Sequence, residues 1–236
     1  MRKLNIIIER LLGLFYPAKC PFCGQIWEGI CDDCREKYPL IQEPRCKKCG
    51  KPIQKETEEY CYDCKKTEHY YEWGRSLWVH KEPVNEAIYA FKYKNKRIYG
   101  EIFARELAKT YGKRLKQQKV ELIIPIPLHK SRRRERGYNQ TEIIANYLGE
   151  YTGIDVDCTS LIRVKKTTPQ KRYNDKERKK NIKNAFALKR EIHAKSVVLI
   201  DDIYTTGSTI DEAARILKKS GVTNVCFLTI SVGQGY

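Results

Sequence analysis

Hydrophobic and polar positions alternate in short blocks between residues 67 and 236. Apolar runs at 75–79, 121–124 and 197–200 have the length of buried strands, and the last is rich in β-branched residues. Apolar residues at helical spacing occupy the segments between and after these runs, at 83–93, 98–115, 141–151 and 210–220. Strands alternating with helices predict an α/β fold, in which a mainly parallel sheet carries flanking helices on both faces.

The N-terminal stretch, residues 1–17, is apolar enough to suggest a secretion signal at first. Glu9 and Arg10 interrupt it and no small-residue cleavage site follows, so we do not expect secretion. Its apolar residues instead fit one face of a helix. No run in the sequence is long enough to span a membrane, and we expect a cytoplasmic protein.

Eight of the ten cysteines lie in the first quarter of the chain, as four C-x-x-C pairs. Such a turn offers two thiolates to one ion, and two turns complete a closed tetrahedral zinc site. Four pairs therefore predict two structural zinc ions, without which this segment should not fold. Pairing in chain order is preferred because it needs only short loops, and interleaved pairing stays open. The predicted ligands are Cys20, Cys23, Cys31, Cys34, Cys46, Cys49, Cys61 and Cys64.

A secreted disulfide framework is the main alternative for these cysteines, but it conflicts with the missing secretion signal. Redox chemistry is less favoured, because four copies of the motif suit a scaffold better than a catalyst. We therefore expect two parts in the chain. An N-terminal helix with a double zinc-ribbon module occupies residues 1–66, and the α/β domain occupies residues 67–236.

One stretch of the second part combines a strand, two acids, a small turn and a helix. It reads K-S-V-V-L-I-D-D-I-Y-T-T-G-S-T from Lys195. This order places backbone N–H groups and a helix N-terminus where they can bind a phosphate. A glycine permits close approach of the anion, and hydroxyls can donate to it. The predicted phosphate-binding residues are Thr205, Thr206, Gly207, Ser208 and Thr209.

Asp201 and Asp202 need a separate reason, because a phosphate site alone does not favour negative charge. Carboxylates accept hydrogen bonds from sugar hydroxyls, and they bind Mg²⁺ directly or through water. The stretch therefore predicts a phosphorylated sugar as ligand. The plainer alternative is a Rossmann-like strand end with an ordinary acid pair and a helix cap.

Charge is distributed unevenly along the chain. Lys and Arg number 46 against 29 Asp and Glu, which gives a net charge of +17, yet residues 17–66 carry ten basic and nine acidic side chains. Residues 130–190 carry seventeen basic and seven acidic side chains, more positive charge than one sugar phosphate requires. This surplus predicts a polyanionic partner.

Basic residues near Tyr138, Tyr147 and Tyr173 are typical of a surface that binds single-stranded nucleic acid. Cations follow the phosphate backbone there, and rings stack on the bases. A mobile lid that closes over phosphates is an equal alternative. The predicted nucleic-acid residues are Arg132, Arg133, Arg134, Arg136, Lys171, Arg172 and Arg178.

The stretch at 195–209 resembles the phosphoribosyl pyrophosphate (PRPP) motif of type I phosphoribosyltransferases. The resemblance implies that Asp201 and Asp202 hold the ribose hydroxyls, and that residues 205–209 wrap the 5′-phosphate. It also implies that a loop after the strand at 121–124, with His129 and Lys130, meets the pyrophosphate. If transfer occurs, Asp202 would stabilise the positive charge that develops at C1 of the ribose.

A wider resemblance covers nearly the whole chain. The four C-x-x-C pairs combine with A-F-K-Y-K, P-I-P-L-H-K-S-R-R-R-E-R-G-Y-N-Q, R-V-K-K-T-T-P-Q and E-R-K-K-N-I-K-N-A-F. Together these motifs resemble the ComF/ComFC family of bacterial competence proteins, in which a zinc-finger module is joined to a phosphoribosyltransferase domain. The resemblance implies a role with single-stranded DNA taken up during natural transformation, beside a DNA helicase partner.

Three functions follow from these observations. A competence protein that binds PRPP, Mg²⁺ and single-stranded DNA is preferred. An active phosphoribosyltransferase with an unknown acceptor is the alternative. An adaptor with a vestigial pocket is disfavoured, because the acid pair and the loop are both complete, and glutamine-dependent amidotransfer is not expected without a glutaminase domain.

Overall fold

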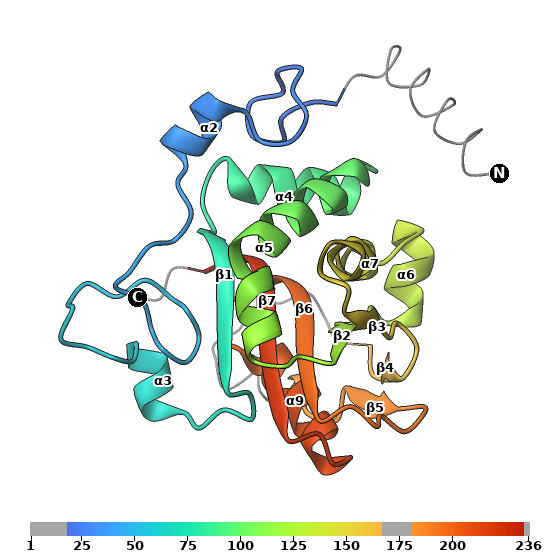
Figure 1. Ribbon diagram of the computed structural model, residues 1–236. Helices are drawn as coiled ribbons and strands as arrows, with labels where there is room; N and C mark the ends of the chain where they lie inside the picture. The colour runs from blue at the N-terminus through green and yellow to red at the C-terminus, as the bar shows by residue number, and fades with distance from the viewer. Residues whose placement is uncertain (1–17, 167–180, 234–236) are drawn as a thin grey trace.

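A five-stranded parallel sheet forms the centre of the protein (Figure 1). The computed structural model describes residues 18–166 and 181–233. The strand order is β1-β7-β6-β2-β3, and every neighbouring pair is parallel. The strands are β1 (Trp73–Val79), β2 (Leu122–Pro125), β3 (Asp155–Val156), β6 (Ser196–Tyr204) and β7 (Asn224–Val232). The predicted α/β class is confirmed.

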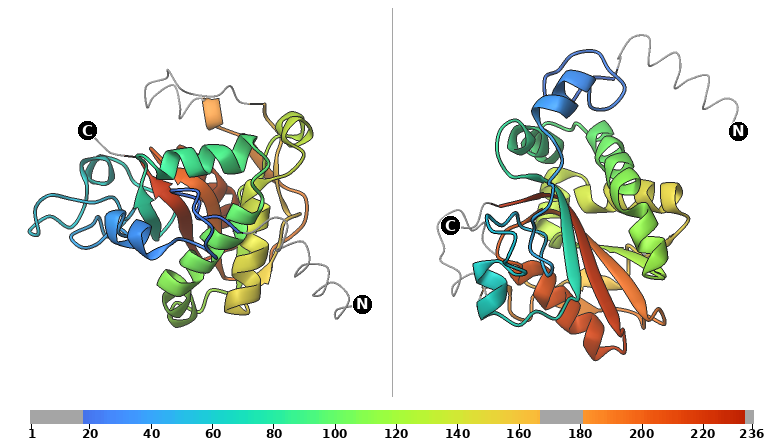
Figure 2. Two further views of the ribbon diagram at one scale, coloured as in Figure 1. Left: turned by 90° about the horizontal axis from the view of Figure 1, so that it is seen from above. Right: turned by 60° about the vertical axis from the view of Figure 1, so that its left-hand side comes forward.

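Helices cover both faces of this sheet (Figures 1 and 2). One face carries α4 (Val84–Tyr93), α5 (Ile98–Gln117) and α7 (Gln140–Thr152). The other carries α9 (Ser208–Lys219) and an antiparallel hairpin of β4 (Leu161–Arg163) and β5 (Phe186–Leu188). A short helix, α6 (Lys130–Arg136), follows β2. Among the described residues, no helix has the length and hydropathy needed to cross a bilayer.

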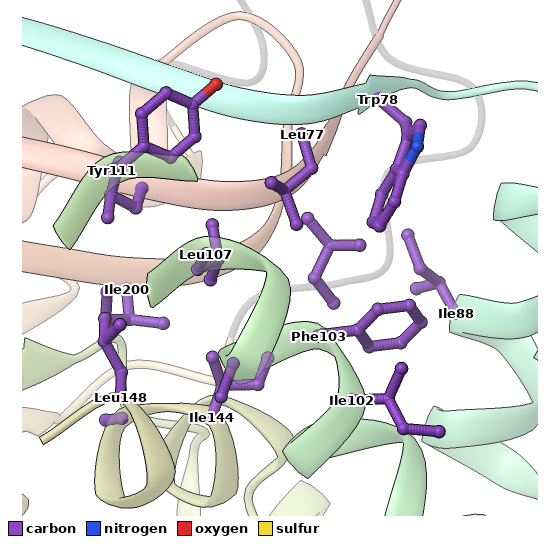
Figure 3. Close-up of a cluster of buried hydrophobic side chains, with 14 of the residues drawn as sticks. Leu77, Trp78, Ile88, Ile102, Phe103, Leu107, Tyr111, Ile144, Leu148 and Ile200 are labelled. Carbon is purple, nitrogen blue, oxygen red and sulfur yellow. The ribbon is translucent and has the colours of Figure 1, made fainter. Parts of the chain in front are cut away.

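Strand β6 divides the core between the two faces. Val198 and Ile200 join the buried cluster beneath α4, α5 and α7, part of which Figure 3 shows. Val197 and Leu199 join the second cluster, beneath α9 and the hairpin. This division follows from the two-residue period of a strand. Consecutive residues at the end of β6 therefore face opposite sides of the sheet.

Strand β6 is longer than its apolar run predicts. Its pairing with β7 continues to Tyr204, which lies opposite Val232. Asp201 and Asp202 therefore lie within the strand, whereas the sequence placed them after it. Backbone pairing does not require an apolar side chain, so the hydropathy pattern predicted the end of the strand too early.

The cysteine module forms two ribbons, each with one short helix. The first ribbon (residues 18–38) contains α2 (Asp32–Lys37), and the second ribbon (residues 43–66) contains α3 (Tyr62–Lys66). In Figure 1 the first lies above α4 and α5, and the second lies beside β1. The first ribbon is joined to α5 by two hydrogen bonds from Arg35 to Glu106, at 2.7 and 2.8 Å. The second is joined to β1 by the Gly74 N–H, which donates to Lys48 O at 2.7 Å.

Candidate functional site

The candidate site lies at the carboxyl edge of the sheet, where the parallel strands end. The buried Asp202 on β6 is its centre. Its Oδ2 accepts a hydrogen bond from Gln140 Nε2 at 2.6 Å and lies 2.9 Å from Lys92 Nζ. Lys92 comes from the last turn of α4 and Gln140 from the first residue of α7, so two helices of one face converge on this carboxylate.

Local sequence explains how Gln140 reaches the site. The side chain of Asn139 accepts a hydrogen bond from the Thr141 N–H, which caps α7. The same side chain donates to Ile126 O at 3.2 Å, just beyond the end of β2. Helix α7 therefore begins at the carboxyl edge of the sheet, with Gln140 directed at Asp202.

Asp201 faces the opposite side of the sheet from Asp202. It is partly buried, and its Oδ1 accepts a hydrogen bond from the Asp202 N–H at 2.9 Å. Burial, followed by the neighbouring Asp202 carboxylate, raises the pKa of Asp201 to about 7, although Lys92 and Arg163 oppose the shift. Asp201 is therefore a carboxyl group that changes charge near neutral pH.

The 205–209 loop follows β6 directly and leads into α9. Gly207 adopts φ +79°, the left-handed region, and a Cβ added there would lie 2.6 Å from Tyr204 Oη. The hydroxyls of Thr206 and Ser208 lie 3.0 Å apart. The first turn of α9 presents N–H groups that have no partner within the helix, and its dipole favours an anion. The loop therefore has the chemistry of a phosphate site, as its sequence predicts.

Aromatic and carboxylate side chains stabilise this loop by contacts with the residues on either side of it. The Tyr204 hydroxyl lies 2.8 Å from the Tyr71 hydroxyl, and the Tyr204 ring stacks on Phe227 with centroids 4.7 Å apart. Burial raises the pKa of both phenols. Asp211, in the first turn of α9, accepts a hydrogen bond from the Tyr70 N–H at 3.0 Å and contacts His69 Nδ1. The segment 69–71 connects the second ribbon to β1. It thus contacts Tyr204 and Asp211, which lie on either side of the 205–209 loop.

The basic segment after β2 is a helix, where the sequence predicted a loop. His129 caps it by accepting a hydrogen bond from the Ser131 N–H, and Lys130 is its first residue. Both residues follow β2, which pairs with β6, so they lie at the same sheet edge as the acid pair. The residues from Lys130 to Arg136 form α6 because capping by His129 and a run of helix-compatible residues outweigh charge repulsion.

The predicted nucleic-acid residues have different surroundings. Arg133 is paired with Glu142 at 2.5 Å, Arg134 is exposed, and Arg132 is partly buried. Arg136 donates to Gln140 and lies over the Tyr93 ring, 4.9 Å from its centroid. Lys171, Arg172 and Arg178 lie outside the described residues.

Two of the predicted stacking rings are placed unfavourably for that role. Tyr138 is only 8% exposed, and its hydroxyl donates to Phe91 O. Tyr147 is partly buried and stacks on Tyr151. The prediction was wrong for Tyr138, because tyrosine in a basic segment says nothing about which side chains the core requires, and it stays a prediction for Tyr147. Tyr173 lies outside the described residues.

The eight predicted zinc ligands form two groups of four. In each group the Sγ atoms all lie within 4.8 Å of one another, and both groups follow chain order, which confirms the preferred pairing. Cys23 and Cys31 Sγ are 3.6 Å apart, as are Cys49 and Cys61 Sγ. Zn–S bonds of about 2.3 Å in a tetrahedron separate the sulfurs by about 3.8 Å, so both groups fit a closed zinc site.

Sequence reasoning did not place three other residues in the site. They are His80, Lys92 and Gln140. His80 directly follows β1, and its Nδ1 lies 2.9 Å from Ser231 Oγ. Burial, and after it the positive charge of Lys92, lowers the pKa of His80. Lys92 and Gln140 stand within motifs of the ComF/ComFC resemblance, but no spacing rule relates them to an aspartate distant in the chain.

Comparison with protein families agrees with the architecture. Residues 11–65 match the family described as Double zinc ribbon domain, and residues 134–232 match the family described as Phosphoribosyl transferase domain. Fold and site together thus define a double zinc ribbon joined to a phosphoribosyltransferase domain.

Relatives of known name align with most of this chain. Competence protein F of Haemophilus influenzae is 33% identical over 89% of this chain and 95% of its own. The chain therefore belongs to the competence protein F (ComF/ComFC) family. Competence protein ComFC of Bacillus subtilis is 27% identical over 82% of this chain and 80% of its own. DNA utilization protein YhgH of Salmonella typhimurium is 27% identical over 90% of this chain and 94% of its own.

Among solved structures, a purine phosphoribosyltransferase from Pyrococcus horikoshii Ot3 aligns with 56% of this chain and 83% of its own. The sequence identity is 16% and the TM-score is 0.34. A likeness at this level supports no conclusion about the ligand.

Proposed function

We propose that this protein binds PRPP with Mg²⁺ at the carboxyl edge of its sheet and single-stranded DNA on the adjoining basic surface. In this role it handles imported DNA in the cytoplasm during natural transformation. The observation that carries the proposal is the contact of Asp202 with Lys92 and Gln140 beside the N-terminus of α9. A fixed carboxylate next to an anion-binding turn suits a ligand with both hydroxyls and phosphates.

Each part of PRPP has a proposed partner at this edge. Residues 205–209 would bind the 5′-phosphate through backbone N–H groups and hydroxyls. Asp201 and Asp202 would accept hydrogen bonds from the ribose hydroxyls. His129 and Lys130 would meet the pyrophosphate, because they follow the strand beside β6.

The acid pair also suits Mg²⁺. Asp201 Oδ2 and Asp202 Oδ1 accept no hydrogen bond from the described residues, and oxygen is the ligand that Mg²⁺ prefers. When bound, the ion would neutralise part of the pyrophosphate charge. In the absence of Mg²⁺, Lys92 balances the charge of Asp202.

A second candidate function is transfer of the phosphoribosyl group to an unknown acceptor. The buried Asp202 favours it, because a carboxylate held by Lys92 and Gln140 beside the ribose would stabilise positive charge at C1. In that step the bond from C1 to the pyrophosphate oxygen breaks and pyrophosphate leaves with the bonding electrons, while a lone pair of the acceptor forms the new bond to C1. The side chains of His129 and Lys130 would then face the departing group.

Calorimetric titration of the zinc-loaded protein with PRPP and Mg²⁺ tests the first proposal. We expect binding by the natural chain, and a loss of at least about tenfold in Asp201→Asn/Asp202→Asn, because two charged acceptors are removed. Asp155→Asn, an exposed carboxylate on β3, is the matched control and should bind normally. Equal binding by all three proteins would overturn the proposed site.

Pyrophosphate release separates the two candidate functions. PRPP and Mg²⁺ are incubated with the protein and a cell extract as acceptor pool, with Asp201→Asn/Asp202→Asn as control. Release that the control lacks would establish transfer and start a search for the acceptor. Binding without release would leave PRPP as a regulator or anchor, and DNA as the ligand to follow.

Two further expectations belong to the proposal. We place the boundary between the zinc module and the phosphoribosyltransferase-like domain after residue 66, and limited proteolysis tests it. The family resemblance supports a competence DNA helicase as partner. Affinity capture of that helicase by the zinc-loaded chain tests this expectation, and failure of the purified pair to associate would count against it.

A further inference from the structure

Helix α4 presents two tyrosines on its outer face. Tyr89 is 54% exposed and Tyr93 is 62% exposed. They are four residues apart, which places them on one side of the helix, and their ring centroids lie 4.9 Å apart. The opposite side of α4 supplies Val84, Ala87, Ile88 and Phe91 to the core, so packing of the helix does not require the outer rings.

The hydroxyls of these two tyrosines have no hydrogen-bond partner among the described residues. Tyr151 on α7, also exposed at 41%, differs in this respect, because its hydroxyl donates to Glu101 and its ring stacks on Tyr147. The α4 pair is therefore an apolar surface with no structural function that the fold reveals.

Cations lie beside the pair, toward the C-terminal end of α4. Residues 92–97 read K-Y-K-N-K-R, four basic side chains without an acidic one. Lys94 Nζ lies 6.0 Å from the Tyr89 centroid, and the Arg136 guanidinium lies 4.9 Å from the Tyr93 centroid. The Arg97 guanidinium lies 4.7 Å from the Tyr138 centroid. The turn after α4 and the end of α6, distant in sequence, thus form one basic surface around two open rings.

This surface adjoins the candidate PRPP site. Lys92 lies between the two tyrosines in the sequence of α4, and it reaches Asp202. Arg136 donates to Gln140, whose amide also binds Asp202. The same helices therefore supply both the contacts of the acid pair and the exposed rings.

We propose that Tyr89 and Tyr93, with Lys94, Arg97 and Arg136, form a platform on which bases of single-stranded DNA stack. The assignment of DNA as the ligand of this platform rests on the proposed function. Rings bind the faces of unpaired bases, and neighbouring cations neutralise the phosphates between them. The absence of acid among residues 92–97 favours a polyanion over a protein partner. Duplex DNA hides its base faces, so it would use the cations of the platform and not its rings.

Fluorescence anisotropy of a dye-labelled oligothymidylate with the full zinc-loaded chain tests the platform. Tyr89→Ala/Tyr93→Ala should weaken binding by about tenfold or more, with an unchanged dependence on salt, because stacking releases no counterions. Tyr89→Phe/Tyr93→Phe keeps the rings and should bind within about twofold of the natural chain. Arg136→Ala should lower the slope of log affinity against log salt by about one.

Controls separate stacking from misfolding. Tyr151→Ala removes a tyrosine of similar exposure at the far end of α7 and should bind normally. Duplex DNA of the same length should bind the alanine double variant as it binds the natural chain. PRPP binding by the double variant should also be unchanged, which shows that the neighbouring site is intact.

The possible results are distinguishable. Normal oligothymidylate binding by the alanine double variant would overturn the platform and leave the proposed function standing. Equal losses for single-stranded and duplex DNA would overturn stacking as the mode of binding. If the natural chain binds no oligothymidylate, the platform and the DNA part of the proposed function both fail, and PRPP binding is judged separately.

Discussion

The two zinc ribbons share the same ligand set and the same local geometry, yet they pack against opposite sides of the core. Cys31 caps α2 and Cys61 caps α3 in the same extended conformation. The buried cysteines of the first ribbon join the cluster that contains Trp78 and Phe103, on the face of α4, α5 and α7. Those of the second join the cluster that contains Tyr204, on the face of α9.

This difference determines what each ribbon can influence. The first ribbon is held by the ion pair of Arg35 with Glu106 and by the edge of Phe22 against Trp78, with centroids 5.3 Å apart. The second leads through residues 69–71 to the underside of the 205–209 loop, where Tyr71 contacts Tyr204. One ribbon therefore stabilises the helical face, and the other supports the candidate phosphate-binding turn.

Loss of one zinc site at a time should have the largest effect. Cys31→Ser and Cys61→Ser are matched, since each removes the ligand that caps a ribbon helix. Each variant should lose one zinc ion. It should also lose the stabilisation that binding of this ion contributes, which reaches about 10 kcal/mol or more for structural zinc. Cys61→Ser should also weaken PRPP binding by at least about tenfold, because it frees the segment under the 205–209 loop.

Zinc content by mass spectrometry and PRPP affinity by calorimetry give the two readouts. Cys31→Ser should lower the midpoint of thermal unfolding while it keeps PRPP affinity within about threefold of the natural chain. Equal losses of PRPP affinity in the two variants would show that the ribbons do not differ in their influence on the site.

Removal of the ion pair should be the next largest effect, and it concerns only the first ribbon. In Arg35→Ala the Glu106 carboxylate, 4% exposed, keeps one cationic partner among the described residues, Lys109 at 3.8 Å. An unpaired buried carboxylate is costly, and because Arg35 is itself partly exposed we expect a loss of about 2–3 kcal/mol in the free energy of unfolding. Urea denaturation measures it, and PRPP affinity should not change.

An exposed ion pair of the second ribbon is the control. Lys47 and Glu59 are each more than half exposed, so Lys47→Ala should lower the free energy of unfolding much less than Arg35→Ala does. Similar losses for Arg35→Ala and Lys47→Ala would mean that Glu106 is solvated and that the first ribbon is held by its apolar contacts alone.

The sequence predicted those features that depend on local pattern. Period and β-branched content predicted the strand at 197–200, and C-x-x-C spacing predicted both zinc sites in chain order. The turn at 205–209 followed from its small residues and glycine. Each of these depends on neighbours within a few residues, which a single sequence contains.

Contacts between distant segments could not be predicted in the same way. Lys92 meets Asp202 across 110 positions of the chain, and Tyr71 meets Tyr204 across 133. These contacts depend on sheet order and helix placement, which no local period specifies. The same reason explains the wrong choice of stacking rings, since burial of Tyr138 and exposure of Tyr93 result from tertiary packing.

Gly207→Ala should affect only the 205–209 loop, which the second ribbon supports. Alanine would adopt the left-handed region at a cost of about 1–2 kcal/mol, and its Cβ would meet the Tyr204 hydroxyl. The turn must move to relieve this contact, so PRPP affinity should fall by at least about tenfold. Gly221→Ala is the control, because its φ of +96° imposes a similar strain while its Cβ would meet nothing within 4 Å. Equal PRPP affinities would show that the turn tolerates displacement.

A pH-dependent effect distinguishes the two acids, which face opposite sides of the sheet. The pKa of Asp201 is raised to about 7 by burial and by Asp202, whereas an unfolded aspartate titrates near 4. Below about pH 4 the group is neutral in both states and costs nothing. As pH rises toward 7 the unfolded chain loses this proton first, so the folded state loses stability, and above 7 the loss is complete.

Asp201→Asn removes this titration and should therefore gain stability relative to the natural chain as pH rises. We expect the difference between their unfolding midpoints, measured without PRPP and Mg²⁺, to grow between pH 5.5 and 7 and to level off by pH 8. Asp155→Asn, an exposed carboxylate at the edge strand, should show no such growth. A constant difference for Asp201→Asn would mean that Asp201 is ionised throughout this range. The carboxyl group on the side of α9 would then be charged and ready for a ligand throughout this range.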